Sequence, residues 1–405
     1  MNSADPPSLS DDRYADWMRA AVALAKQGIG LVEPNPTVGC ILVDESHLGQ
    51  ALGDVEFRSA KFDLPEALSH HPAVLGLGFH QRFGGPHAEV HALDDCRERG
   101  HAPEGATAIV TLEPCCHFGK TPPCANALIQ AGVARVVVGA VDPNPQVDSG
   151  GIKRLRDAGI DVVVGVASEP CQDLIAPFVK GLQRRQPWVI AKWAMSIDGK
   201  IATRTGSSQW ITGDLARQDV HRQRGLVDAI LCGAGTLRKD DPELTARPPG
   251  PRKARRLVMC GDHFPLADRK LLSTIDRAPV TLVLCGNSRN ADGESRRDWS
   301  RAGAEILTLT SEGSTAQIHE LLSLLHEQAV TRMIVEGGGR LLGSFFAADA
   351  IDEIHAYIGG KLIGGAKAPG PLGGQGIDTI DQAPSFRCLD LQRLGPDCRL
   401  TYRKG

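Results

Sequence analysis

The first half of this 405-residue chain contains three residues suited to binding a metal ion. His87 is followed by Cys115 and Cys124, and Glu89 lies two residues after the histidine. One imidazole and two thiolates supply the three protein ligands of a catalytic zinc site, whose fourth position is left for water. Zinc lowers the pKa of that water to about 7 and so provides a nucleophile at neutral pH. The spacing therefore predicts a catalytic zinc site.

Glu89 is predicted to be the catalytic residue of this site. A carboxylate that does not bind the metal can carry a proton from the water to a departing amine. His-x-Glu followed by Pro-Cys is typical of zinc deaminases that act on an amino-substituted pyrimidine or purine ring. A scaffold without metal is the alternative. We expect Cys116 and His91 to lie near the metal without binding it, because a fourth protein ligand would close the catalytic position.

The elements that must position these residues alternate between helices and strands. Residues 14–28 have apolar side chains at helical spacing, and β-rich runs predict buried strands. His87 and Glu89 are expected to open a helix, and Cys115 to follow a strand. This alternation is typical of an α/β sandwich. The predicted strands cover residues 38–43, 106–112, 134–140 and 161–166, and further helices cover residues 124–132 and 152–159.

A domain boundary is predicted near residues 181–187, which divides the chain into domains 1–183 and 187–405. The second half has its own strands, a helical stretch that ends near Arg224 and a late helix, which together predict a second α/β domain. Its glycine run 337–339 lies between a strand and a helix, an arrangement that can bind a phosphate, although a plain tight turn is the alternative. The strands cover residues 188–194, 229–232, 256–259, 280–284 and 332–335, and the late helix covers residues 341–346.

The composition excludes several classes of protein. A formal net charge of −3 argues against binding nucleic acid through bulk charge, and 42% hydrophobic residues are enough for two cores. No secretory signal and no membrane-spanning run is visible, so no membrane partner is expected. The 11 cysteines, an odd number without regular spacing, indicate free thiols in a reducing cytoplasm.

Six motifs of the first half resemble the riboflavin-biosynthesis pyrimidine deaminases. The nine-residue step from Cys115 to Cys124 differs from the Pro-Cys-x-x-Cys of cytidine and tRNA-adenosine deaminases. The resemblance implies a cytidine-deaminase-like α/β/α sandwich with one Zn²⁺ per chain. It also implies that Asn35, His80 and His117 contact the substrate, although Asn35 by itself reads equally well as a turn residue. The motifs lie at residues 34–40, 80–82, 85–89, 111–117, 119–124 and 142–145.

The second half resembles the dihydrofolate-reductase-like α/β reductase domain that is fused to that deaminase. The resemblance implies NADPH, and it assigns two groups of residues. The cofactor-binding group is Ala194, Trp210, Thr236, Asp240, Gly338, Gly339, Arg340, Leu341, Leu342, Gly343 and Ser344. The substrate-binding group is Ser208, Arg224, Leu244, Arg247 and Glu336.

Several of these reductase residues have a second interpretation or an undecided role. Arg224 and Arg247 are suited to binding the substrate phosphate. Without the family pattern, they would be interpreted as ordinary residues of a solvent-exposed face. Lys192 and Asp240 are both candidates for a polar role near the reacting sugar. The sequence does not decide which of the two donates the proton.

Together the two halves predict a bifunctional enzyme that acts on small pyrimidine ribotides, first by hydrolytic deamination and then by NADPH-dependent reduction. Two alternatives are a single active domain and a deaminase for another amino-pyrimidine or purine nucleotide. The family implies a homo-oligomer, either a dimer or a tetramer. Residues 46–76 are longer than the short turn expected before His80, and they are predicted to be a surface insertion that could serve as a lid or subunit contact.

Overall fold

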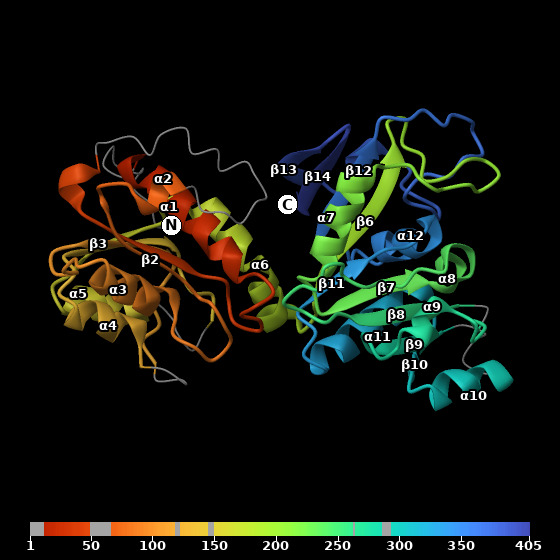
Figure 1. Cartoon of the computed structure of the whole chain (residues 1–405), viewed down its shortest axis with the longest axis horizontal. Helices are drawn as coiled ribbons and strands as arrows, with labels where there is room; N and C mark the ends of the chain where they lie inside the picture. The colour runs from red at the N-terminus through yellow and green to blue at the C-terminus, as the bar shows by residue number, and fades with distance from the viewer. Residues whose placement is uncertain (1–11, 49–65, 118–121, 145–149, 262–263, 286–292) are drawn as a thin grey trace. The chain divides into compact units, whose positions relative to one another are not determined.

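The computed structural model describes residues 12–48, 66–117, 122–144, 150–261, 264–285 and 293–405. The chain divides into two compact units, Met1–Gln183 and Arg184–Gly405 (Figure 1). Both units combine helices with one central sheet, as the sequence predicts. In the described part of the chain, no helix is long and apolar enough to cross a membrane.

The first unit is built on a five-stranded sheet with the order β2-β1-β3-β4-β5. β1 is antiparallel to both of its neighbours, whereas β3, β4 and β5 are parallel. β1 and β3 are buried along their whole length, which explains their continuous apolar sequences. The strands are β1 Gly39–Val43, β2 Val74–Phe79, β3 Thr107–Leu112, β4 Arg135–Ala140 and β5 Asp161–Val164.

Helices cover both faces of this sheet, and α3, α4 and α5 lie together on the side away from α1 (Figure 1). The result is an α/β/α sandwich around one apolar core. The helices are α1 Asp12–Ala25, α2 Glu66–Ser69, α3 Ala88–Glu98, α4 Cys124–Gln130, α5 Gly150–Asp157 and α6 Ser168–Arg184, with short 3-10 turns at η1 Lys26–Gly28 and η2 Glu45–His47.

Two glycines of β2 bring α3 unusually close to the sheet. A Cβ on Gly76 would lie 2.2 Å from the Ala92 carbonyl oxygen, and one on Gly78 would lie 2.2 Å from the Ala88 carbonyl oxygen. Only glycine permits this approach of helix and strand backbones. The contact fixes the first turn of α3, and with it Glu89, beside the end of β2.

The second unit contains a nine-stranded sheet with the order β10-β9-β8-β7-β11-β6-β12-β14-β13. The strands from β10 to β12 are parallel, and β14 and β13 continue the sheet as antiparallel strands. They are β6 Trp188–Ser196, β7 Ala229–Gly233, β8 Arg255–Cys260, β9 Val280–Leu284, β10 Glu305–Thr308, β11 Arg332–Val335, β12 Glu353–Gly359, β13 Phe386–Leu394 and β14 Asp397–Lys404.

The helices of the second unit connect the parallel strands and bury their apolar faces against them. α11 and α12 contribute Leu321, Leu325, Leu342 and Phe345 to the main core. The helices are α7 Asp214–Arg224, α8 Ala234–Asp240, α9 Lys270–Ser273, α10 Glu294–Arg301, α11 Ser314–Glu327 and α12 Gly339–Ala347, with a 3-10 turn at η4 Ile380–Gln382.

Every predicted strand is present within a few residues of its expected ends, and five strands were not predicted. β2 alternates glycine with apolar residues, β10 has only four residues, and β13 is largely exposed, so these three lack a buried apolar run. β2 begins at Val74, so the last three residues of the predicted insertion 46–76 belong to this strand. Residues 49–65 at the centre of that insertion lie outside the described residues.

Candidate active site

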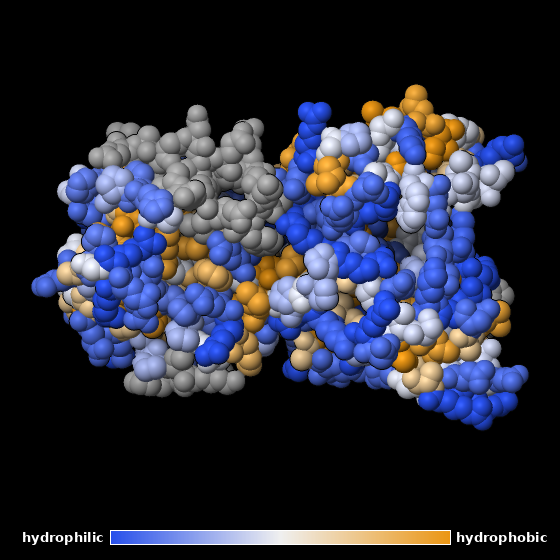
Figure 2. Space-filling view, in the orientation of Figure 1, coloured by the Kyte–Doolittle hydropathy of each residue, from blue (hydrophilic) through white to orange (hydrophobic). Residues whose placement is uncertain are grey.

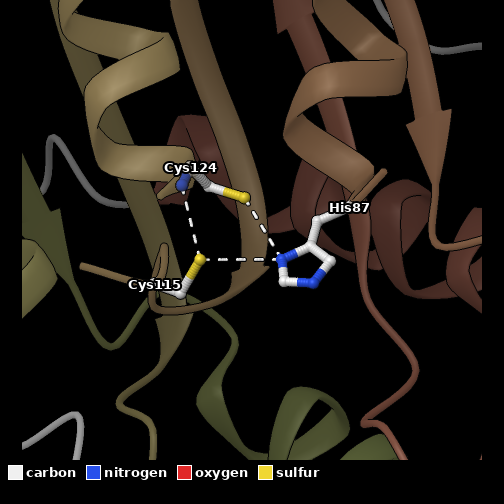
Figure 3. A group of neighbouring side chains, drawn as sticks. All are labelled: His87, Cys115 and Cys124. Atoms are coloured by element: carbon white, nitrogen blue, oxygen red, sulfur yellow. Dashed lines mark hydrogen bonds between the residues drawn. The ribbon is translucent and has the colours of Figure 1, made fainter. Parts of the chain in front are cut away.

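The predicted metal ligands come together from three separate elements (Figure 3). His87 precedes α3, Cys115 follows β3, and Cys124 begins α4. The His87 Nδ1 atom lies 3.6 Å from the Cys115 Sγ and 3.3 Å from the Cys124 Sγ. Zinc–nitrogen and zinc–sulfur bonds at tetrahedral angles would separate such atoms by about 3.6 Å. The donor set and its spacing therefore fit a zinc ion with three protein ligands.

Hydrogen bonds favour the thiolate form of Cys115. The backbone N–H of Cys124 donates to the Cys115 Sγ over 3.3 Å. A hydrogen bond from the Cys124 thiol, with help from His87, lowers the pKa of Cys115 well below its ordinary value despite burial. The same pairing raises the pKa of Cys124. The two sulfurs thus share a proton that zinc would displace, because thiolates are the metal-binding form.

Glu89 lies in the first turn of α3 and is 3% exposed. Burial raises its pKa to about 7, with a further increase from the Cys115 thiolate and an opposing effect from His87. A carboxyl group with a pKa near the working pH can both accept and return a proton. The carboxyl interacts electrostatically with Cys115 and His87, two of the three predicted ligands.

Asn35 and His80, 45 residues apart in the sequence, meet beside the metal cluster. The Asn35 Nδ2 lies 3.2 Å from the His80 Nε2, and the other ring nitrogen of His80 lies 3.0 Å from the Pro86 carbonyl oxygen. The His80 and His87 rings form an edge-on pair with centroids 5.0 Å apart. His80 is 2% exposed, so this pair forms part of the buried wall beside His87.

The other residues near the metal cluster take no part in the ligand set. His117 is exposed and interacts electrostatically with Asp142. The Sγ of Cys116 packs against Gly150. His91 stays outside the cluster, and its buried Nε2 has no hydrogen-bond partner among the described residues.

Glu113 is a supporting residue that the sequence analysis did not single out. Its buried carboxylate accepts hydrogen bonds from the backbone N–H groups of Gly151 (3.0 Å) and Ile152 (3.1 Å) at the start of α5, and from Asp142 (3.3 Å). A Cβ on Gly151 would lie 1.9 Å from the Pro114 carbonyl oxygen. Glu113 therefore ties the segment that carries Cys115 to α5. In the sequence, this role is indicated by the position of Glu113 as a single acidic residue between an apolar strand and the Pro-Cys motif.

A cleft of about 1120 Å³ lies in the second unit, where β6, β7 and β11 end. All but two of the residues predicted for the reductase line it. The predicted residues on its wall are Ala194, Ser208, Trp210, Arg224, Thr236, Asp240, Leu244, Arg247, Glu336, Gly338, Gly339, Arg340, Leu341 and Ser344. The other two, Leu342 and Gly343, are buried in α12, with the Leu342 side chain in the core and a Cβ on Gly343 only 2.1 Å from the Gly373 carbonyl oxygen.

Three charged side chains form a buried network on the cleft wall. Arg224 donates two hydrogen bonds, of 2.7 and 2.9 Å, to the Glu336 carboxylate. The Lys192 Nζ lies 3.6 Å from the same carboxylate. Burial alone would raise the pKa of Glu336, but Arg224 and Lys192 outweigh it and lower the pKa to about 2. Burial lowers the pKa of Lys192. Arg224 is thus paired in a buried position, whereas Arg247 pairs with Glu243 (3.3 Å) at a more exposed one.

His221 lines the cleft beside these residues and was not predicted. It shares one face of α7 with Arg217 and Arg224, at a helical spacing that the sequence contained. Its Nδ1 lies 3.0 Å from the Thr245 carbonyl oxygen, and its Nε2 lies 3.1 Å from an Arg247 nitrogen. Because Arg247 can only donate, His221 must accept there and is neutral. Burial, together with Arg224, lowers its pKa.

Comparison with known proteins identifies the class to which this fold and site belong. Residues 11–140 match the family model of the cytidine and deoxycytidylate deaminase zinc-binding region, and residues 187–400 match the RibD C-terminal domain. The first unit is thus a cytidine-deaminase-like domain, and the second is the reductase-like domain that accompanies it. The chain belongs to the RibD family of riboflavin biosynthesis proteins.

Curated relatives and solved structures match nearly the whole chain. The riboflavin biosynthesis protein RibD of Actinobacillus pleuropneumoniae is 35% identical over 96% of this chain and 94% of its own length. The RibD of Escherichia coli is 35% identical over 95% and 97%. A diaminohydroxyphosphoribosylaminopyrimidine deaminase/5-amino-6-(5-phosphoribosylamino)uracil reductase from Thermotoga maritima superposes with a TM-score of 0.75 at 30% identity, covering 98% of this chain and all of the other. Acinetobacter baumannii RibD gives 0.73 at 32% identity with the same coverage.

Proposed function

We propose that this chain catalyses two successive steps of riboflavin biosynthesis. The first unit is a zinc-dependent deaminase that acts on 2,5-diamino-6-ribosylamino-4(3H)-pyrimidinone 5′-phosphate. The second is an NADPH-dependent reductase that converts 5-amino-6-(5-phosphoribosylamino)uracil to its ribitylamino form. The observation that carries the deaminase assignment is the buried carboxyl of Glu89 beside the three metal ligands. The reductase assignment rests on the family match and the cleft.

In the deaminase, Glu89 moves the proton that the reaction requires. His87, Cys115 and Cys124 would hold zinc, which supplies a Lewis acid that activates water at neutral pH. Glu89 accepts a proton from the attacking water as its oxygen bonds to the amino-bearing ring carbon. It then delivers that proton to the nitrogen as the C–N bond breaks and ammonia leaves. Asn35 and His80 would orient the ring.

In the reductase, the residues of the cleft align the cofactor and the sugar. NADPH supplies a hydride, which adds to C1 of the opened ribosyl chain. The imine or aldehyde formed at C1 also needs one proton on its nitrogen or oxygen. We assign that proton to Lys192, because burial lowers its pKa and its ammonium group lies on the cleft wall beside Glu336. Arg247, which His221 helps to orient, would contact the substrate phosphate.

The second unit has an apolar surface that is suited to be the interface of a homo-oligomer. Ile197, Leu362, Ile380 and Leu391 are exposed by 63% or more, and apolar residues gather over the loops that follow β6 and β12 (Figure 2). Leu391 belongs to the edge strand β13. Ile197 and Leu391 line the same surface hollow, and we propose that a second copy covers it, because monomeric proteins rarely expose large apolar patches.

Substitution of one of these residues tests the oligomer. Leu391→Asp should convert the assembly to monomers, because the new carboxylate would have to be desolvated in the interface. Sedimentation velocity of the variant and of Leu266→Asp, a matched change at another exposed leucine, measures the effect. An unchanged sedimentation coefficient for Leu391→Asp would contradict this interface.

We also propose that the protein works in the cytoplasm. All 11 cysteines are free, including the two that would bind zinc. Free thiols persist in a reducing compartment, whereas exported proteins usually oxidise them in pairs. Fractionation of cells that produce the tagged protein would test the location.

Metal content and ammonia release, measured together on wild type and Glu89→Gln, test the deaminase. We expect about one zinc per chain in both proteins, with ammonia release from the diaminopyrimidine ribotide reduced by about 10² to 10⁴-fold in the variant. The loss follows from removal of the proton-carrying group while the ligands remain. NADPH oxidation with already deaminated substrate serves as the control and should be unchanged.

The same measurements separate the alternatives. Zinc without ammonia release would point to another amino-pyrimidine or purine nucleotide as the substrate. Ammonia release without NADPH oxidation would leave the deaminase as the single active domain. An absence of zinc in the purified holoprotein would contradict the proposed metal centre.

A further inference from the structure

A segment that follows β12 is fastened to the end of β6 on the cleft wall. We call residues 361–373 the bridging segment. The backbone N–H of Ile197 donates to the Lys361 carbonyl oxygen, and that of Ile201 donates to the Pro369 carbonyl oxygen, each over 3.0 Å. The loops after β6 and β12 lie next to each other at the upper right of Figure 1. Ile201 and Pro369 both line the cleft.

Asp198 strengthens this connection with its carboxylate. The carboxylate accepts hydrogen bonds from the backbone N–H groups of Ile363 (3.1 Å) and Gly364 (2.7 Å), and from the Ser196 hydroxyl (2.5 Å). The Ser196 hydroxyl and these backbone groups lower the pKa of Asp198 to about 2. The charged side chain thus holds the start of the bridging segment against the turn after β6.

The other end of the bridging segment lies directly on α12. The backbone N–H of Gly373 donates to the Gly339 carbonyl oxygen over 2.9 Å. A Cβ on Gly343 would approach the Gly373 carbonyl oxygen to 2.1 Å, so the two backbones are in contact. Gly338 caps α12, and Gly338 and Gly339 line the cleft. The position of the first turn of α12 therefore depends on the bridging segment.

We propose that Asp198 is a positioning residue for the cofactor of the reductase. It fixes the bridging segment, and the bridging segment fixes the first turn of α12. This inference rests on the proposed function, in which that turn holds the phosphates of NADPH. Most of the residues proposed for the substrate, namely Arg224, Leu244, Arg247 and Glu336, lie outside both the bridging segment and the first turn of α12. Loss of Asp198 therefore weakens NADPH binding and leaves the affinity for the substrate near that of the wild type.

The test compares Asp198→Asn and Asp198→Ala with Asp378→Asn in the full-length holoprotein. Asp378 is an exposed aspartate beyond the bridging segment, so it provides the same chemical change as a control. We expect the KM and the calorimetric Kd for NADPH to rise about tenfold in Asp198→Ala and less in Asp198→Asn, because hydrogen bonds to a charged group are among the stronger ones. The kcat and the KM for the deaminated substrate should change little.

Two results would overturn the inference. One is an unchanged Kd for NADPH in both Asp198 variants, and the other is an equal rise of both KM values, which indicates a general loss of structure. Direct NADPH binding does not require turnover, so it tests Asp198 even if the wild type fails to reduce the ribotide. That failure would contradict the proposed function instead. A wild-type circular dichroism spectrum and melting temperature confirm that the variants are folded.

Discussion

At the scale of single residues, burial sets the proton chemistry of both sites. Glu89 has a raised pKa because its carboxyl is removed from water, whereas Glu336 is equally buried but keeps a low pKa beside Arg224 and Lys192. We propose that the same residue type carries a proton in one unit and remains an anion in the other. Neighbouring charges decide between these two outcomes.

His221 gives the reductase a predictable response to pH. Its pKa lies below the ordinary 6.5, so it is neutral at pH 7 and accepts a hydrogen bond from Arg247. As the pH falls from 6.5 through the lowered pKa, protonation removes that acceptor and leaves Arg247 with Glu243 as its partner (3.3 Å). We expect the KM for the phosphorylated substrate to rise over this range in wild type and to rise less in His221→Gln.

The substrate phosphate also titrates near pH 6. It does so equally for both proteins, so the difference between their KM profiles isolates His221. The measurement is the rate of NADPH oxidation at varied substrate concentration from pH 7.5 to 5.5. Parallel profiles for the two proteins would contradict a neutral His221 that holds Arg247.

At the scale of elements, both sites are assembled where strands end and helices begin. β3 and the starts of α3, α4 and α5 surround the metal cluster, whereas β6, β11 and α12 form the cleft. The carboxyl ends of parallel strands are the usual location of sites in such sheets. Supporting residues such as Glu113 connect these elements and take no direct part in the proposed reaction.

Glu113→Gln tests the connection between β3 and α5. The amide would replace one carboxylate oxygen with a donor that faces the backbone N–H groups of Gly151 and Ile152 or of Asp142. We expect zinc affinity and ammonia release to fall by about 10 to 100-fold, as for other residues that support metal ligands. Competition with a zinc-binding dye measures the affinity. Wild-type zinc affinity in this variant would show that α5 does not help to hold Cys115.

At the scale of the whole molecule, each unit has its own core and its own buried polar network. In the second unit, Asp219 on α7 accepts hydrogen bonds from Tyr357 (2.7 Å) and Arg399 (2.6 Å), which fasten α7 to β12 and β14. Burial would raise the pKa of Asp219, but Arg399 and its other partners lower it overall. The helix that carries His221 and Arg224 is thus held by this carboxylate.

Asp219→Ala should therefore impair one activity and spare the other. Removal of one partner of a buried ion pair costs up to about 3–5 kcal/mol, since Arg399 loses its 2.6 Å pair with Asp219 and is left with the longer one to Asp390 (3.3 Å). We expect lower thermal stability of the second unit and loss of NADPH oxidation, with normal zinc content and ammonia release. Calorimetry and the two assays measure these effects. A loss of both activities would contradict the independence of the two units.

The sequence alone determined the chemistry of the metal site and most of the architecture. His87, Glu89, Cys115 and Cys124 could be identified because a zinc site needs particular residue types at strand and helix ends, and buried strands show as apolar runs. β13 was missed because an exposed edge strand has no such run.

The tertiary structure decided which side chains meet. The pairing of Arg224 with Glu336, the contact of Asn35 with His80, and the supports provided by Glu113, His221 and Asp198 join residues far apart in the chain or depend on backbone groups. No local pattern encodes such contacts, because they arise only when separate elements pack against one another.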